Sequence, residues 1–153
     1  MLNYRTGDLL KSKEDGVQYI VHQVNCQGKM GSGIAKQIKD KYPIVYEEFI
    51  RNYKYNDKPQ LGQIDSIKVE DDFYVINLYG QEYYGYDKRR YTSYDAFWNA
   101  LNLIKEILPA ESIIAFPYRI GCGLGGANWN IIASMIDEVL SDYFNVIIYE
   151  LEE

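Results

Sequence analysis

Two short glycine-rich segments are the parts of this sequence best suited to chemistry. Residues 25–35 contain three of the twelve glycines and residues 119–126 contain four. Glycine lets the backbone approach a ligand and turn its N–H groups inward, and a helix that starts beside such a loop favours an anion. Tight turns that need positive φ are the alternative for one loop. Two loops in matching contexts favour a site that holds a diphosphate from both sides.

Well-known nucleotide motifs fit these segments poorly. Gly121, Gly123 and Gly126 satisfy the G-x-G-x-x-G spacing, but they lie near the end of the chain, where only one further strand is expected. The lysine after Gly28 is followed by methionine, where a P-loop has serine or threonine. A Rossmann dehydrogenase and a P-loop nucleoside triphosphatase are therefore both disfavoured.

The only histidine, His22, lies three residues before Asn25 in an otherwise apolar segment. A titratable group so close to a phosphate loop is a candidate acid, base or nucleophile, and a hydrogen-bonded structural histidine is the alternative. Cys26 and Cys122 fall in the two loops. A metal site built from them and His22 would lack a fourth ligand, so we expect free thiols and no metal.

Strands and helices alternate around these segments. Apolar runs rich in Val, Ile and Tyr predict strands at 19–24, 64–69, 73–79, 113–116 and 146–149. Apolar spacings of three and four predict helices at about 32–41, 44–53, 94–108 and 129–140. Thr92 or Ser93 is placed to cap the third helix and Asn128 the fourth. The pattern predicts an α/β sandwich that binds its ligand beyond the carboxyl ends of the strands.

Length, charge and cysteine content limit the class of protein. The 153 residues predict one domain, residues 1–153, and 16 basic against 22 acidic residues give a net charge of −6. That sign argues against an electrostatic nucleic-acid binder. No apolar run approaches the roughly 20 residues of a membrane span, and two cysteines form no disulfide framework. We expect a cytoplasmic monomer with no membrane or nucleic-acid partner, in which most of the sixteen tyrosines serve packing.

Three motifs, in order along the chain, resemble the macro domain family, whose modules bind ADP-ribose. Residues 7–9 match its opening G-D-[IL] motif, residues 24–35 its first phosphate and ribose loop, and residues 120–124 its second loop. The resemblance covers essentially the whole chain and implies a three-layer α/β/α fold with a central mixed, largely parallel sheet of about six strands. The form of both loops is similar to the branch that contains ADP-ribose 1''-phosphate phosphatase-like proteins and the terminal ADP-ribose protein glycohydrolase.

The resemblance also implies roles for individual residues. Asp8 matches the acid that reads adenine, although an aspartate there is equally suited to capping a helix. Asn25 matches the residue that binds the distal ribose, with an Asx turn as the alternative, and Tyr149 either stacks on adenine or only packs. The other residues of the implied ligand site, most of them backbone donors to the diphosphate, are Leu9, Gly31, Ser32, Gly33, Ile34, Ile120, Gly121, Cys122, Gly123 and Leu124.

The members of this branch differ in the residues that catalyse their reactions. Phosphatase-like members carry a histidine at the place of His22, which makes His22, with Asn25, the catalytic candidate. The glycohydrolase uses an aspartate where this chain has Gly125, and its partner lysine is replaced near Tyr91, with Lys88 the nearest lysine. We therefore expect hydrolysis of ADP-ribose 1''-phosphate to ADP-ribose and phosphate, without a cofactor. The alternatives are a non-catalytic reader of free or protein-linked ADP-ribose and a protein mono-ADP-ribosyl hydrolase.

Overall fold

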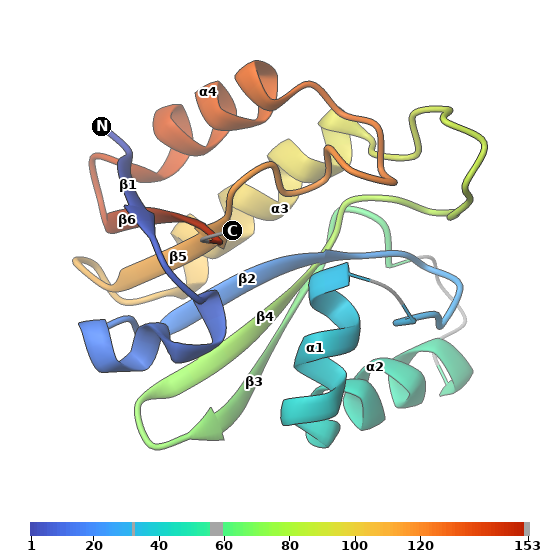
Figure 1. The fold of residues 1–153 in the computed structure, drawn as a ribbon, viewed down its shortest axis with the longest axis horizontal. Coiled ribbons are helices and arrows are strands. Elements are labelled where there is room, and N and C mark those ends of the chain that lie inside the picture. The colour runs from blue at the N-terminus through green and yellow to red at the C-terminus, as the bar shows by residue number, and fades with distance from the viewer. Residues whose placement is uncertain (32, 56–59, 152–153) are drawn as a thin grey trace.

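A six-stranded β-sheet is the centre of the computed structural model, which describes residues 1–31, 33–55 and 60–151 (Figure 1). Its strands are β1 (Asn3–Thr6), β2 (Tyr19–Val24), β3 (Ile64–Glu70), β4 (Phe73–Tyr79), β5 (Ile113–Pro117) and β6 (Asn145–Glu150). Their order across the sheet is β1-β6-β5-β2-β4-β3, and neighbours are parallel except for β3 and β4. The predicted mixed, largely parallel sheet is confirmed.

Helices cover both faces of this sheet and complete the three predicted layers (Figure 1). They are α1 (Gly33–Lys41), α2 (Pro43–Tyr55), α3 (Tyr94–Ile107), α4 (Trp129–Leu140) and the 3₁₀ helix η1 (Leu9–Asp15). One core joins α3 and α4 to the sheet, and a second core joins η1, α1 and α2 to the other face. In β2, Val21 packs into the first core and Ile20 into the second, which is why this strand is apolar on successive residues.

Capping residues fix where α3 and α4 begin. The side chain of Ser93 accepts a hydrogen bond from the N–H of Ala96, and Asn128 accepts from the N–H groups of Asn130 and Ile131. The sequence predicted Asn128 as a cap and left Thr92 or Ser93 for α3, and the structure selects Ser93. These side chains satisfy N–H groups that a helix leaves without partners. None of the helices in the described part of the chain is long and apolar enough to cross a membrane.

Two elements, β1 and η1, do not follow from the apolar pattern. All four residues of β1 are exposed, so this edge strand lacks the alternation of buried and exposed side chains that would indicate a strand in the sequence. The η1 helix is set by its ends instead. Asp8 accepts from the N–H of Leu10 at the start, and Gly16 follows the helix with a φ of 89°.

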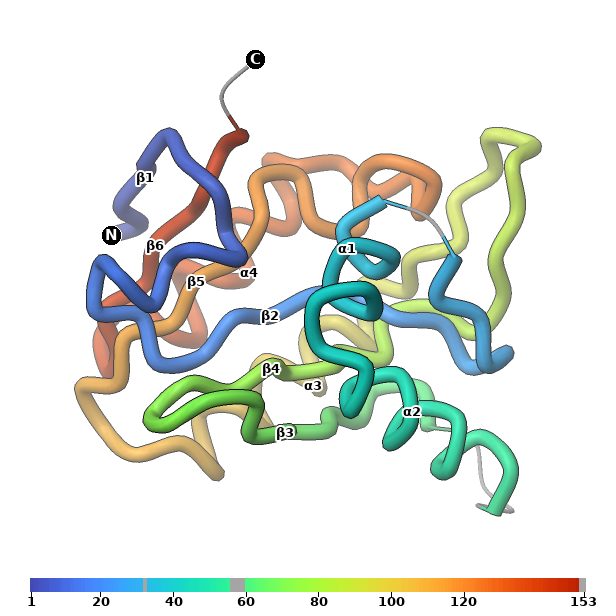
Figure 2. The backbone as a smooth tube through the Cα atoms, turned by 60° about the horizontal axis from the view of Figure 1, so that its bottom comes forward, coloured from blue at the N-terminus to red at the C-terminus, as the bar shows by residue number. Residues whose placement is uncertain are grey.

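Three loops meet at one edge of the sheet. The strands β5, β2 and β4 are neighbours and parallel, so their carboxyl ends lie side by side. The segments that follow them begin at residues 118, 25 and 80, respectively. Figure 2 shows the segment after β4 projecting beyond the rest of the molecule, next to the segment after β2. This edge is where open α/β sheets bind ligands.

Candidate functional site

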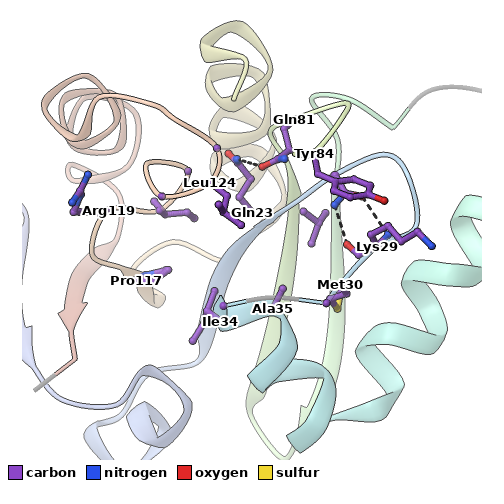
Figure 3. A pocket seen from close by; sticks show the side chains of 18 of the residues that line it. Gln23, Lys29, Met30, Ile34, Ala35, Gln81, Tyr84, Pro117, Arg119 and Leu124 are labelled. Carbon is purple, nitrogen blue, oxygen red and sulfur yellow. Dashed lines mark hydrogen bonds between the residues drawn. The ribbon is translucent and has the colours of Figure 1, made fainter. Parts of the chain in front are cut away.

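A cleft of about 650 Å³ opens between these three loops and the start of α1 (Figure 3). In Figure 3, Arg119 and Pro117 lie at one end, Lys29 and Tyr84 at the other, and Gln23 and Ile34 between them. The full set of described lining residues is 23–25, 29–31, 33–35, 39, 46, 81, 84–86, 117–121 and 123–125. Both predicted glycine loops therefore contribute to one cavity.

The second loop presents free backbone donors to this cleft. Among the described residues, the N–H groups of Gly121, Gly123, Leu124 and Gly125 donate to no other group, and these four residues line the cleft. Unpaired N–H groups that converge in a turn form a site for an anion. Cys122 is a correction to the predicted donor set, because its N–H donates to the carbonyl oxygen of Arg119 at 2.8 Å. Its side chain is buried, and it closes the turn without lining the cleft.

Asn25 shapes the first loop and also lines the cleft. Its Oδ1 accepts from the N–H groups of Gln27 (3.0 Å) and Lys29 (3.3 Å), and its Nδ2 donates to the carbonyl oxygen of Lys29 (2.9 Å). This is the Asx turn that the sequence offered as an alternative. Because the residue reaches the cleft as well, its role towards a ribose stays a prediction.

The amino end of α1 closes the cleft below the first loop. Gly31, Gly33 and Ile34 line the cavity, and Gly33 is the first residue of the helix, with a φ of 60°. The first N–H groups of a helix have no partners inside it, and its dipole is positive at that end. The predicted ligand residue Ser32 lies outside the described residues. Ile120, another predicted ligand residue, lines the cleft from the second loop.

The charge of the cleft is opposite to that of the whole chain. Its described lining includes Lys29, Lys39 and Arg119 but no aspartate or glutamate, although the protein carries a net charge of −6. None of the three cations forms an ion pair with a described residue. The Lys39 ammonium lies 3.9 Å from the centre of the Tyr46 ring, which also lines the cleft. This cavity suits an anionic ligand.

Arg119 holds its place in the second loop with a strained backbone. Its φ is 62°, in the left-handed region that favours glycine. The residue is exposed and lines the cleft, and no described acidic partner fixes its guanidinium. Strain of this kind persists where the local structure requires it, and it is common at binding sites.

His22 lies beneath the cleft and not in it. The side chain is fully buried, and its Nε2 is 2.6 Å from Oδ1 of Asn77 on β4. Burial lowers the pKa of His22 to about 4, against a smaller opposing effect of the Asn77 hydrogen bond, so the ring is neutral at pH 7. This placement favours the structural interpretation of His22, because a proton donor or acceptor must reach the reacting atoms. Its catalytic role stays a prediction that the geometry does not support.

The predicted adenine residues lie beside the cleft, outside its described lining. The Asp8 carboxylate caps η1, and Leu9 is buried. Tyr149 is 3% exposed, and its hydroxyl donates to Asp15 at 2.8 Å. Its carbonyl oxygen accepts from the N–H of Tyr118, which does line the cleft. Packing therefore accounts for the Tyr149 ring in this structure, and its stacking on adenine stays a prediction, as does the reading of adenine by Asp8.

Gly125 is a glycine for a steric reason. A Cβ atom at this position would lie 2.5 Å from the carbonyl oxygen of Gly121 and 2.5 Å from Oγ1 of Thr92. The loop therefore has no room for the aspartate that the glycohydrolase branch carries there. Lys88 does not substitute for the missing lysine, because it is exposed and lies outside the described lining of the cleft.

Sequence reasoning missed several residues that line the cleft. Gln23 alternates with buried residues on β2, and Lys39 lies on α1 four residues after Ala35, which also lines the cleft. The signal for Lys39 was this helical spacing, since residues four apart share a face. Tyr84 and Tyr86 come from residues 82–91, here named the tyrosine loop, and nothing in their spacing indicated a site.

The two cysteines behave as structural thiols. Cys26 is partly buried and Cys122 is buried, and both are free. Burial raises the pKa of Cys26 to about 11, so its reactive thiolate is scarce at neutral pH. Among the residues that the structure describes, no three His, Cys, Asp or Glu side chains gather to hold a metal ion.

The sequence model of the Macro domain family matches residues 21–136, which run from β2 to α4 and include all three loops of the cleft. The chain belongs to the Macro domain family. A protein of Enterobacteria phage T4 described as an uncharacterized 17.5 kDa protein is 30% identical over 97% of this chain and 96% of its own length. A macro domain fold was the expectation from the sequence, and it is confirmed.

The curated relatives include proteins with named activities. A DNA ADP-ribosyl glycohydrolase of Mycobacterium tuberculosis is 26% identical over 84% of this chain, and an ADP-ribose 1''-phosphate phosphatase of Meyerozyma guilliermondii is 31% identical over 70% of it. The match spans only 36% of the glycohydrolase and 61% of the phosphatase.

Solved structures are similar over nearly the whole chain. A protein of unknown function from Bacteroides thetaiotaomicron has a TM-score of 0.88 at 29% identity, with 98% of each chain covered. The macrodomain of Mycobacterium tuberculosis DarG has a TM-score of 0.79 at 25% identity, with 97% of each chain covered. The three-layer fold of this chain is therefore that of known macrodomains.

Proposed function

We propose that this protein binds ADP-ribose in the cleft and hydrolyses ADP-ribose 1''-phosphate to ADP-ribose and phosphate. The observation that carries the proposal is the charge of the cleft. Three cations and four free N–H groups line it, with no carboxylate among its described residues, in a chain of net charge −6. A ligand rich in phosphate matches that arrangement.

Different parts of ADP-ribose would bind to different loops of the cleft. The N–H groups of the second loop and the amino end of α1 are suited to the diphosphate. Lys29 lies beside Asn25 in the first loop, the loop that the macro domain resemblance assigns to the distal ribose. A phosphate on that ribose would therefore meet a lysine. The relative from Meyerozyma guilliermondii, an ADP-ribose 1''-phosphate phosphatase, supports the same ligand.

The composition of the cleft suits phosphoryl transfer better than glycosyl transfer. In the hydrolysis, a water oxygen attacks phosphorus, the bond between phosphorus and the 1''-oxygen breaks, and that oxygen takes a proton. Such reactions depend on positioning and on positive charge around the phosphoryl oxygens, which Lys29 can provide at the end of the cleft formed by the first loop. Glycosidases usually need carboxylates at the reacting carbon, and the described lining has none.

A second candidate is removal of ADP-ribose from DNA, and the tyrosine loop is the observation that favours it. Tyr83, Tyr84 and Tyr86 are 59%, 45% and 70% exposed, and three basic residues follow at positions 88–90. Exposed rings beside cations are typical of surfaces that bind single-stranded nucleic acid. The DNA ADP-ribosyl glycohydrolase relatives support this candidate, and the steric closure at Gly125 counts against it.

Calorimetry and turnover assays test both candidates. We expect ADP-ribose to bind in the micromolar range, about −8 kcal/mol, and phosphate release from ADP-ribose 1''-phosphate to exceed ADP-ribose release from modified single-stranded DNA or modified protein. Lys29→Gln should weaken binding, whereas Lys36→Gln, on the solvent side of α1 and paired with Asp40, should not. No heat at millimolar ADP-ribose would refute the proposal, and faster turnover of modified DNA would select the second candidate.

A further inference from the structure

Thr92 is a buried hydroxyl residue that directly follows the tyrosine loop and forms two hydrogen bonds to the second glycine loop. It is 1% exposed and immediately precedes Ser93, the cap of α3. Its Oγ1 donates to the carbonyl oxygen of Gly121 at 2.8 Å, and its N–H donates to the carbonyl oxygen of Gly125 at 2.9 Å. One residue thus holds both ends of the segment 121–125, in which every N–H group except that of Cys122 donates to no described residue.

Gln23 on β2 fixes the Thr92 hydroxyl in turn. Its Nε2 donates to Oγ1 of Thr92 at 2.8 Å and to Oε1 of Gln81 at 2.8 Å. Figure 3 shows the Gln23 side chain reaching Gln81 from the middle of the cleft floor. Because Oγ1 of Thr92 accepts a hydrogen bond from Gln23, the hydroxyl group is free to donate its own hydrogen to the carbonyl oxygen of Gly121.

Three glycines lie close to the side chains of Thr92 and Gln23. A Cβ atom at Gly121 would lie 3.2 Å from Oγ1 of Thr92, and one at Gly125 would lie 2.5 Å from it. At Gly80, a Cβ atom would overlap Oε1 of Gln23. Side chains at these positions would displace Thr92 or Gln23, so glycine is required for the close approach of the three segments.

Each of the two carbonyl oxygens that Thr92 binds accepts a second hydrogen bond from the backbone. The Gly121 oxygen also accepts from the N–H of Ala127, and the Gly125 oxygen also accepts from the N–H of Tyr91. Both oxygens are therefore engaged inside the protein, while the N–H groups of Gly121 and Gly125 donate to none of the residues that the structure describes. A carbonyl oxygen turned towards a phosphate would repel it, whereas an N–H group attracts it.

We infer that Thr92 is the positioning residue of the anion site: by binding two carbonyl oxygens of the second loop, it keeps the free N–H groups of that loop directed at the diphosphate. The inference rests on the proposed binding of ADP-ribose. Thr92 itself does not line the cleft, so it acts through the loop and not by touching the ligand.

Paired substitutions test this role by calorimetry with ADP-ribose. Thr92→Val removes the hydroxyl at nearly constant volume and should weaken binding at least about tenfold, the factor for one hydrogen bond to a charged group. Thr92→Ser keeps the hydroxyl and should bind within about threefold of wild type. The matched control is Ser112→Ala, which removes another buried hydroxyl bonded to a backbone oxygen, that of Pro109 at 2.6 Å, away from the cleft. It should lower stability and leave affinity unchanged.

A second measurement separates this inference from the proposed function. In amide NMR spectra, inorganic diphosphate should shift the signals of Gly121, Gly123 and Gly125 in the wild type and in Thr92→Ser, but much less in Thr92→Val. Wild-type affinity in Thr92→Val, or equal losses in the Val and Ser variants, would overturn the role of Thr92. If the wild type does not bind ADP-ribose, the proposed function fails, and the NMR shifts caused by diphosphate then test the role of Thr92 by themselves. Equal shifts in wild type and Thr92→Val, or none in wild type, would overturn the inference.

Discussion

Gly125→Asp is the substitution that separates loop geometry from loop chemistry. It restores the aspartate that the glycohydrolase branch carries at this position, so an argument from residue type alone predicts a gain of glycohydrolase activity. The structure predicts the opposite. The new Cβ atom would lie 2.5 Å from both the Gly121 oxygen and the Thr92 hydroxyl oxygen, and both of these are held by other hydrogen bonds.

The size of the effect follows from this overlap. Carbon and oxygen atoms in contact normally stay beyond 3 Å, so the loop must move by at least half an ångström at a buried position. Overpacking of this kind typically costs about 1–3 kcal/mol, or roughly 3–10 °C in thermal midpoint for a chain of this length. Gly125→Ala should show most of that loss. Gly125→Asp should also weaken ADP-ribose, because it adds a negative charge to the anion site.

Gly123 provides the matched control in the same loop. A Cβ atom there would meet no atom within 4 Å, and its φ is not positive. Gly123→Ala should therefore leave the thermal midpoint unchanged, and Gly123→Asp should weaken the binding of ADP-ribose without destabilising the fold. Differential scanning calorimetry, titration with ADP-ribose and release of ADP-ribose from modified protein and DNA measure the three properties. A stable Gly125→Asp protein that gains glycohydrolase activity would refute the reasoning.

Three further substitutions probe the strained arginine, the adenine-side acid and the buried histidine. Arg119→Gly should raise stability by about 1 kcal/mol through relief of its φ of 62°, yet weaken ADP-ribose about tenfold by loss of a charged contact; a melt and a titration should move in opposite directions. Asp8→Ala should cost about 1 kcal/mol of stability by loss of the cap on Leu10 and weaken ADP-ribose by roughly 1–3 kcal/mol, with far less effect on ribose 5-phosphate. Asp8→Asn keeps the cap, so unchanged affinity in Asp8→Asn would assign Asp8 to the fold alone. The unfolded chain protonates His22 near pH 6.5 and the folded chain only near pH 4, so stability should fall as the pH drops through this window, by on the order of 2 kcal/mol at pH 5. Urea unfolding of His22→Gln at pH 7.5 and pH 5 should lack that contribution, and an unchanged pH dependence would contradict the burial argument.

The elements of this protein were largely determined by local sequence. Ser93 and Asn128 mark the starts of α3 and α4, because a side-chain oxygen one position before a helix satisfies its free N–H groups wherever the helix packs. The apolar β2 likewise reads as a strand covered on both faces. By contrast, β1 pairs with β6 as a parallel edge strand, and its four exposed side chains carry no apolar pattern that could reveal it.

The glycine loops of the site were also visible in the sequence, since glycine marks positions where the backbone itself must do the binding or turning. What the sequence did not contain was the environment of each residue. His22 and Gln23 are adjacent on β2, but alternation of side chains across the sheet buries His22 against Asn77 and brings Gln23 to the cleft.

Only the tertiary structure decided which distant residues meet. From the sequence, Thr92 was a candidate cap of a helix. In the structure it binds Gly121 and Gly125, because β4 and β5 both flank β2 and end at the same edge of the sheet. The same packing placed Lys39 in the cleft and closed the space beside Gly125. Local sequence fixes backbone conformation and caps through neighbours along the chain, whereas the charge and free volume of a site depend on segments that only the folded sheet brings together.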